Sequence, residues 1–174
     1  EFGAKDVGTG VEIGANDVVN VLNEGGGQHG PGPQASSSLY INEKTTGWDY
    51  EALSKIDNLY INNITLHSNS LTIKNKCKLT NCTLNDMTIT NNGNLTIKDC
   101  YLISTKINGG IIDISYSENY NKSTNGLYET SLNGTIQITN NSSKEIDLIN
   151  LTHEKGTIAI SNTKNGKIKT ITFK

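Results

Sequence analysis

A repeat of 22 residues at the end of the chain constrains its fold more than any other feature. The tripeptide Gly-Thr-Ile begins at Gly134 and again at Gly156. When the sequence is shifted by this distance, apolar residues fall on apolar ones and polar residues on polar ones. The matched pairs are Ile136 with Ile158, Ile138 with Ile160, Ile146 with Ile168, Ile149 with Ile171, Leu151 with Phe173, Thr139 with Ser161 and Asn140 with Asn162. Agreement of both classes over a whole unit indicates a structural repeat.

Further matches continue the repeat toward the N-terminus at a shift of 23 to 24 residues. Leu71 and Ile73 in "LTIKN" fall on Leu95 and Ile97 in "LTIKD". The other matches are Ile61 with Leu84, Ile64 with Met87, Leu66 with Ile89, Leu84 with Ile107, Ile89 with Ile112, Ile112 with Ile136 and Ile114 with Ile138. The sequence therefore predicts about five units of 22–24 residues within residues 57–174.

Short alternating segments such as "LTI", "IDI", "TIQI" and "TIAI" recur in each unit. Alternation of apolar and polar residues is the signal of a half-buried strand. Asn, Gly, Asp and Ser separate these segments, and these residues tolerate turn geometry. A unit of 22–24 residues has room for three short strands and three corners. The predicted fold is therefore all-β, a parallel β-helix in which each turn stacks about 4.8 Å above the last.

Charged residues one period apart support this register. Glu145 falls on Lys167, and Asp147 falls on Lys169. Stacked strands favour opposite charges at neighbouring outward positions. The sequence therefore predicts that both pairs face outward, side by side.

The segments "LTIKNKCKL", "LTIKDCYLI" and "GTIAISN" resemble the rung pattern of right-handed parallel β-helix proteins. The opening "EFGAK", followed by "NDVVNVLNEGGG", is similar to the entry segment of phage tailspikes and related pectin-lyase-like proteins. The resemblance implies a solenoid fold, and many such proteins are lyases or glycosidases that act on polysaccharides. It does not by itself imply an activity, because one fold carries many functions.

Residues 1–56 do not follow the repeat and form a predicted second region: an arm, a link and a cap. The stretch 25–38 is rich in Gly, Pro and Ser, which is typical of a flexible link or a long surface loop. An arm before it is expected either to fold back on its own chain or to dock on a neighbouring subunit. "DYEALSKI", residues 49–56, predicts a short helix that caps the first turn. The last residues are "KIKTITFK", which the pattern places within a strand. We expect either that another chain covers that edge or that further residues belong there.

Composition limits the chemistry that the chain can perform. Its net charge is −2, and all 15 basic residues are Lys. A nucleic-acid partner is not expected, since such binders are usually basic and use Arg. No run is long and apolar enough for a membrane span. Cys77, Cys82 and Cys100 are predicted to be small buried hydrophobes and not ligands or a disulfide. Histidines are isolated, and neither a metal nor another cofactor is expected.

The polar segment 115–134 carries three tyrosines, Tyr116, Tyr120 and Tyr128. A tyrosine-bearing loop on a rigid scaffold is a candidate contact surface for a sugar or a protein. The alternative interpretation is a solvated loop whose tyrosines pack along the outside. These three residues are the only binding residues predicted, and no catalytic residue is predicted.

The expected function is that of a non-enzymatic structural or adhesive component of an extracellular assembly. Candidates are a virus or phage fibre or spike, a cell-surface adhesin and a filament subunit. The expected partners are copies of the chain, other subunits of the assembly, and a cell-surface glycan or receptor. The alternative is a tailspike-like glycosidase, which needs two carboxylates about 5–9.5 Å apart. Asp99, Asp113 and Glu118 are its only candidates near the long loop.

Overall fold

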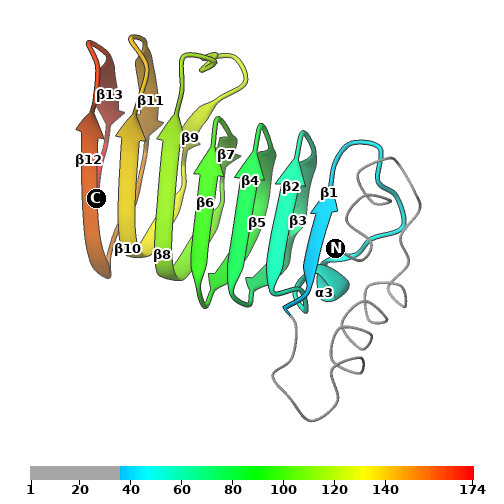
Figure 1. Cartoon of the computed structure of the whole chain (residues 1–174). Coiled ribbons are helices and arrows are strands. Elements are labelled where there is room, and N and C mark those ends of the chain that lie inside the picture. The colour runs from blue at the N-terminus through cyan, green and yellow to red at the C-terminus, as the bar shows by residue number, and fades with distance from the viewer. Residues whose placement is uncertain (1–35) are drawn as a thin grey trace.

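The computed structural model describes residues 36–174. The expected N-terminal arm and nearly all of the Gly/Pro-rich link lie outside the described residues. The described chain is a parallel β-solenoid of about seven turns, whose strands stack turn upon turn (Figure 1). The all-β class and the β-helix architecture predicted from the sequence are confirmed. The number of turns is larger than the five expected.

Thirteen strands and one short helix make up the described chain. They are β1 (Ser38–Ile41), α3 (Tyr50–Leu53), β2 (Asn58–Asn62), β3 (Thr65–Ile73), β4 (Lys76–Thr80), β5 (Thr83–Asn91), β6 (Asn94–Lys98), β7 (Tyr101–Ile103), β8 (Lys106–Tyr116), β9 (Gly126–Tyr128), β10 (Ser131–Asn140), β11 (Glu145–Ile149), β12 (Gly156–Asn162) and β13 (Lys167–Ile171).

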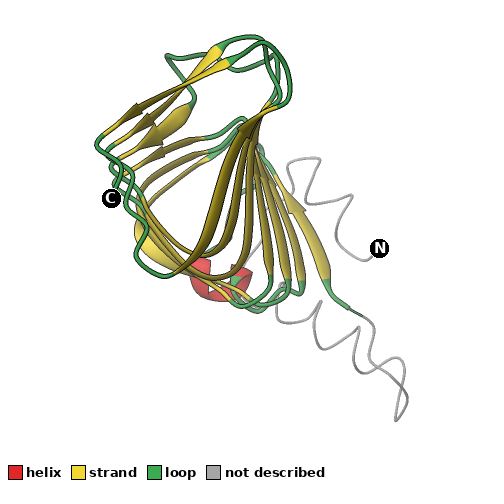
Figure 2. Cartoon of the chain, turned by 90° about the vertical axis from the view of Figure 1, so that its left-hand side faces the viewer, coloured by secondary structure: helices red, strands yellow, loops and turns green. Residues whose placement is uncertain are grey.

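The strands form three faces around one interior, which Figure 2 shows in a view along the stack. Face 1 consists of β1, β2, β4, β6, the second halves of β8 and β10, and β12. Face 2 consists of the starts of β3 and β5, followed by β7, β9, β11 and β13. Face 3 consists of the ends of β3 and β5 and the starts of β8 and β10.

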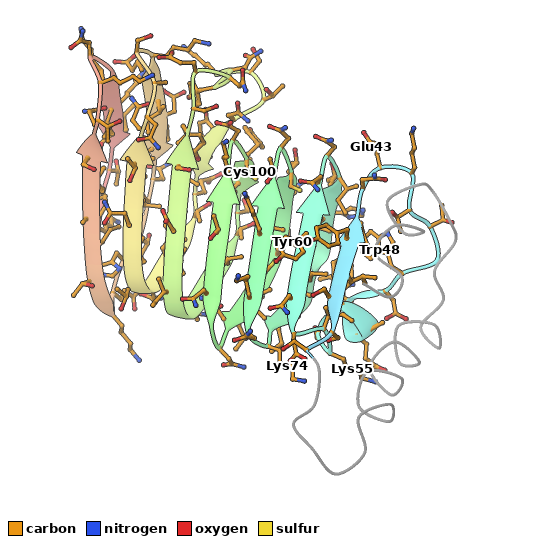
Figure 3. All side chains as sticks on the ribbon, viewed as in Figure 1. Glu43, Trp48, Lys55, Tyr60, Lys74 and Cys100 are labelled. Atoms are coloured by element: carbon orange, nitrogen blue, oxygen red, sulfur yellow. The ribbon has the colours of Figure 1, made fainter. Side chains whose placement is uncertain are left out.

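Alternating side chains fill the interior from all three faces. In β2, for example, Leu59 and Ile61 are fully buried while Tyr60 between them points outward (Figure 3). Successive side chains of a strand point to opposite sides, so each strand gives every second residue to the core. Burial of each such Leu or Ile contributes about 1.5–3 kcal/mol to stability. A single turn buries little alone, and stacking makes the core continuous.

The repeat length differs between the two halves of the solenoid. In the first half, equivalent residues are 18 apart: Asn58 pairs with Lys76, and Lys76 with Asn94. The shift of 23 to 24 predicted there is wrong. Leu71 pairs with Ile89 on face 3, whereas Leu95 pairs with Cys77 on face 1. The shorter period also explains why there are more turns than expected.

In the second half the predicted register is confirmed. Ile136 pairs with Ile112 and with Ile158, and Glu145 pairs with Lys167. Longer corner loops account for the longer turns, above all residues 117–125 between β8 and β9. Asp147 pairs with Lys169 as predicted, but its carboxylate is buried and accepts a hydrogen bond from the Tyr128 hydroxyl at 2.9 Å.

The repeated Gly-Thr-Ile marks a corner of the solenoid. Gly134 and Gly156 pair with each other and have φ values of 138° and 94°. L-residues with a side chain rarely adopt such angles. A Cβ on Gly156 would also meet the carbonyl oxygen of Gly134. Glycine therefore lets successive turns approach closely at this corner.

The solenoid begins at β1, which pairs with β2 in parallel. The described turns therefore start before residue 57, within the region 1–56 that was expected to be an arm, a link and a cap. The predicted helix is present as α3, with Asp49 as its N-cap: the carboxylate accepts a hydrogen bond from the Ala52 N–H at 2.7 Å. This helix covers the open edge of β3, since the His67 N–H donates to the Tyr50 hydroxyl and the Thr72 N–H to Ser54 Oγ. It thereby blocks strand addition at that edge.

Candidate functional site: a polar groove along one corner

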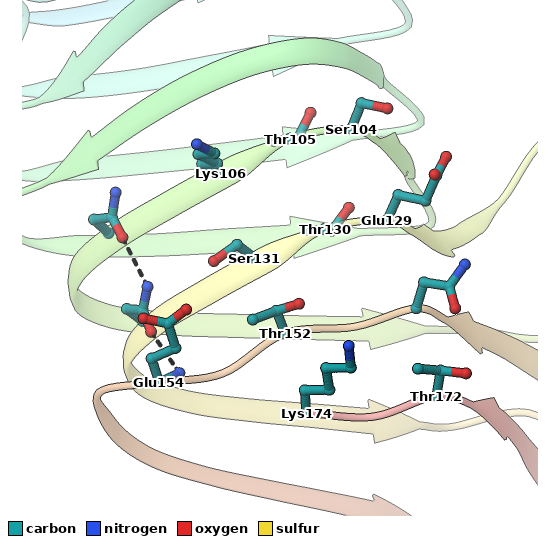
Figure 4. A pocket seen from close by; sticks show the side chains of 13 residues that line it. Ser104, Thr105, Lys106, Glu129, Thr130, Ser131, Thr152, Glu154, Thr172 and Lys174 are labelled. Carbon is teal, nitrogen blue, oxygen red and sulfur yellow. Dashed lines mark hydrogen bonds between the residues drawn. The ribbon is translucent and has the colours of Figure 1, made fainter.

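A polar groove follows the corner between faces 2 and 3 in the later turns (Figure 4). Its volume is about 760 Å³, within the range of about 300–1,000 Å³ that is typical of ligand sites. All the side chains that line it are polar or charged. The groove residues are Ser104, Thr105, Lys106, Asn108, Glu129, Thr130, Ser131, Asn133, Asn150, Thr152, Glu154, Thr172 and Lys174.

One wall of the groove consists of corner residues with a left-handed backbone. Ser104, Glu129 and Asn150 have φ values of 49°, 48° and 56°, and they follow β7, β9 and β11. All three side chains are exposed. This geometry turns the chain sharply from face 2 to face 3. Because each turn repeats it, the three side chains line up along the groove.

The floor is built from residues in register on neighbouring strands. Ser131 at the start of β10 pairs with Lys106 of β8 and, by an isolated bridge, with Thr152. Beside them Thr105 and Thr130 are buried, and their hydroxyls donate to the carbonyl oxygens of Ile103 and Tyr128. These hydrogen bonds stabilise the corner that follows β7 and the corner that follows β9. Lys106, Ser131 and Thr152 keep their polar groups toward the groove (Figure 4).

The other wall is held by a pair of asparagines. The Asn133 side-chain amide donates to Asn108 Oδ1 at 3.0 Å. Its own Oδ1 accepts from the N–H groups of Glu154 and Lys155, at 2.8 and 2.9 Å. Three successive turns are thus joined by side-chain hydrogen bonds, and the wall is preorganised. Preorganised polar groups order a ligand without a large entropic cost.

Charge in the groove is balanced. Lys106 and Lys174 supply two positive charges, and Glu129 and Glu154 two negative ones, among hydroxyl and amide groups. The groove therefore offers many donors and acceptors without a strong net field. Such a surface suits a neutral ligand that itself carries many hydroxyl groups.

The three predicted tyrosines lie elsewhere, and two of them are in the interior. Tyr116 is fully buried and Tyr120 is 2 % exposed, so neither ring offers a contact surface. The expectation of a tyrosine-bearing outer surface is corrected to this extent. Tyr116 is the last residue of β8 and Tyr120 lies in the following loop 117–125, so the contact between their buried rings helps to hold the loop on the end of the strand. Tyr128 is half-buried, and its pKa is raised by burial and by the neighbouring Asp147 carboxylate.

Of the three carboxylates proposed for a glycosidase, Asp99 and Glu118 hold local structure by hydrogen bonds. Asp99 is buried and accepts hydrogen bonds from the N–H and hydroxyl of Ser117, at 2.7 and 2.6 Å. Glu118 accepts from the Ser143 N–H at 3.1 Å, and this bond helps to lower the pKa of its carboxyl. Asp113 lies on face 1, between Thr96 and Gln137. None of the three lines the groove.

Within residues 36–174, no group of three or more His, Cys, Asp or Glu side chains is placed to hold a metal ion. The same part of the chain contains no helix long and apolar enough to cross a membrane. All three cysteines are buried, as predicted, and their thiols are free.

Sequence reasoning missed the groove, although a signal for it exists. The segments "KING" at 106–109 and "SLNG" at 131–134 place a polar residue, an apolar residue and Asn-Gly in the same order. When the two segments are aligned on their Asn-Gly pairs, Lys106 falls on Ser131 in the floor of the groove, and Asn108 falls on Asn133 in its wall. Asn108 and Asn133 are 25 residues apart. The repeat was matched at shifts of 22 to 24 residues, so it did not align these two asparagines.

Comparison of the chain with protein-family models, with curated proteins and with solved structures found no match.

Proposed function

We propose that the protein is a non-enzymatic structural and adhesive component of an extracellular assembly, and that its groove binds a neutral oligosaccharide. A fibre or spike of a virus or phage, a cell-surface adhesin and a filament subunit are the assemblies that suit such a rod. The observation that carries the proposal is the stacking of hydroxyl, amide and balanced charged groups from successive turns along one groove.

Two further features support an adhesive role. Neighbouring turns hydrogen-bond to each other along all three faces, which makes the solenoid a stiff support for a binding surface. The groove runs along the stack and not into the core, so an extended chain can lie in it. Hydroxyl-rich ligands of this shape match its donors and acceptors one turn after another.

A glycan array with matched variants tests the proposal. The groove variant carries Lys106→Ala, Ser131→Ala and Thr152→Ala, three residues stacked in register. The control variant carries Lys98→Ala, Ser115→Ala and Thr139→Ala, stacked in the same way on face 1. Each set contains one exposed Lys, with a half-buried Ser and Thr.

We expect the wild-type chain and the control variant to bind the same glycans, and the groove variant to lose at least tenfold in affinity. Binding that is equal in all three proteins would refute the groove as the site. If the wild-type chain binds none of the neutral glycans on the array, the proposal of a neutral oligosaccharide as ligand is refuted.

A glycosidase is the second candidate, on one observation: Glu129 and Glu154 both line the groove. Two carboxylates across a bound sugar are the minimum for acid–base cleavage of a glycosidic bond. Release of reducing ends from a bound polysaccharide, abolished by Glu129→Gln or Glu154→Gln with binding retained, would establish this activity. Binding without release supports the adhesive proposal.

A further inference from the structure

Two of the three cysteines occupy equivalent positions in neighbouring turns. Cys82 comes directly before β5, and Cys100 directly before β7. The strands pair in parallel from the next residue on, Thr83 with Tyr101, and the Tyr101 N–H donates to the Cys82 carbonyl oxygen at 2.9 Å. The third cysteine, Cys77, pairs with leucines on both sides and has no cysteine neighbour in the stack.

The thiol groups of Cys82 and Cys100 are oriented alike. Cys82 Sγ approaches the carbonyl oxygens of Thr80 and of Ile61 in the preceding turn, at 3.4 and 3.3 Å. Cys100 Sγ approaches those of Lys98 and Leu79 in the same way, at 3.3 and 3.6 Å. Each sulfur therefore points toward the preceding turn.

For Cys100 the preceding turn is the one that carries Cys82. The Cys82 N–H donates to Cys100 Sγ at 3.4 Å. Paired residues of neighbouring parallel strands have Cα atoms about 5 Å apart. A disulfide requires a Cα separation of about 4.4–6.8 Å. The strand spacing satisfies this condition. Closing the bond then requires rotation about both Cα–Cβ bonds and an approach of the two Cβ atoms to about 3.5–4.5 Å.

We propose that Cys82 and Cys100 are a disulfide site, which closes when the chain folds in the presence of a small-molecule disulfide such as oxidised glutathione. The thiolate of one cysteine attacks the glutathione disulfide, forms a mixed disulfide and releases one glutathione thiol. The second cysteine then attacks the protein sulfur of that mixed disulfide and releases the second glutathione thiol. Two protein thiols are oxidised to one S–S bond, and one glutathione disulfide is reduced to two thiols.

The folded environment favours the thiolate of Cys82 over that of Cys100. Hydrogen bonding with the Cys100 thiol lowers the pKa of Cys82, whereas burial raises that of Cys100. Reactivity in thiol exchange depends on the thiolate. In the folded chain, however, Cys82 is 2 % exposed and Cys100 fully buried. A reagent therefore reaches them before the turns close, or when a turn opens.

The bond would fasten one turn of the solenoid to the next, around a ring that spans 18 residues of sequence. Constraining the unfolded chain in this way stabilises the folded state. Cys100 lies near the middle of the stack (Figure 3), so the bond would hold the turns on which the later, groove-bearing turns rest. It does not depend on the ligand proposed for the groove.

Refolding in a glutathione redox buffer tests the site. The full chain is unfolded in urea with reductant, refolded with reduced and oxidised glutathione, alkylated and digested without reduction. Trypsin cuts after Lys76, Lys78 and Lys98, so the three cysteines fall on different peptides. We expect one alkylated cysteine, Cys77, and a linked pair of peptides that contains Cys82 and Cys100.

Variants and a stability measurement complete the test. Cys77→Ala should keep the linked peptides, while Cys82→Ala and Cys100→Ala should each leave two alkylated thiols. The oxidised wild-type chain should unfold at a higher urea concentration than the reduced chain, and Cys82→Ala should show no such difference. Three alkylated cysteines after oxidative refolding, or a bond that includes Cys77, would overturn the proposal.

Discussion

The ring of Tyr116, at the end of β8, and the ring of Tyr120, in the loop 117–125, meet edge to face, with centroids 5.3 Å apart and planes at 82°. The two buried hydroxyls differ in their partners. The Tyr120 hydroxyl accepts a hydrogen bond from the Asp147 N–H at 3.0 Å. Within the described residues, the Tyr116 hydroxyl has no hydrogen-bond partner. A buried polar group without a hydrogen-bond partner costs free energy of folding. The Tyr116 hydroxyl therefore lowers the stability of the fold.

Tyr116→Phe is therefore expected to stabilise the protein. The change removes the unpaired hydroxyl and keeps the ring that packs on Tyr120, and an unsatisfied buried group costs about 1–3 kcal/mol. We expect the free energy of unfolding in urea to rise by about 1 kcal/mol. The matched control is Tyr128→Phe, whose hydroxyl donates to Asp147 at 2.9 Å. It should lower stability by about 1–3 kcal/mol. A loss of stability in Tyr116→Phe would contradict the expectation.

The fold class follows from the sequence, but the register in its first half does not. "LTIKN" at 71–75 and "LTIKD" at 95–99 match closely, yet they lie on faces 3 and 1. Every face demands the same alternation of buried and outward residues, so apolar matching does not distinguish one face from another. The corners do distinguish them. Asn63, Asn81 and Asp99, which recur every 18 residues, all have positive φ.

The groove was harder to predict than the fold. Its residues come from three or more turns and share polarity but no sequence motif, because the place of a groove depends on where the corners of successive turns lie. The polar segment 115–134 was predicted to be a contact surface because it carries three tyrosines. Tyr116 is nevertheless at an inward position of β8, after Ile112 and Ile114, and the alternation of that strand predicts its burial.

Asn140 is expected to be the most sensitive asparagine of the later turns. It is fully buried, and its amide donates to the carbonyl oxygens of Lys144 and Lys167 and to Asn162 Oδ1. Its Oδ1 accepts from the N–H and hydroxyl of Ser142. Asn140→Ala leaves several of these groups unpaired and should lower stability by about 2–4 kcal/mol in urea unfolding. Asn162→Ala, at the exposed partner position, should cost less than about 1 kcal/mol. Equal losses in the two variants would refute this ranking.

Gly134→Ala should destabilise the corner between faces 3 and 1. The residue has a φ of 138°, and a Cβ there would lie 2.8 Å from the Gly110 carbonyl oxygen. Strain of this kind costs about 1–3 kcal/mol, which thermal unfolding would measure as a lower midpoint. Thr135→Ala, at the next and exposed position, should change stability by less than about 0.5 kcal/mol. An unchanged midpoint in Gly134→Ala would show that the corner has room to adjust.

Asp57 should make the first turns sensitive to acid. Burial opposes its ionisation, but hydrogen bonds from Ser37 and the charge of Lys74, 3.1 Å away, together lower the pKa of its carboxyl. A carboxyl whose pKa is lower in the folded state contributes stability above its ordinary pKa of about 4, and loses that contribution as the pH falls further. At pH 6 the wild-type chain should therefore unfold at a higher urea concentration than Asp57→Asn. This difference between the two midpoints should shrink below about pH 4. Lys74→Met should lower the stability of the wild-type chain, but it should not lower the stability of the Asp57→Asn variant any further. A difference that is constant from pH 6 to pH 2 would show that Asp57 acts by packing and not by its charge.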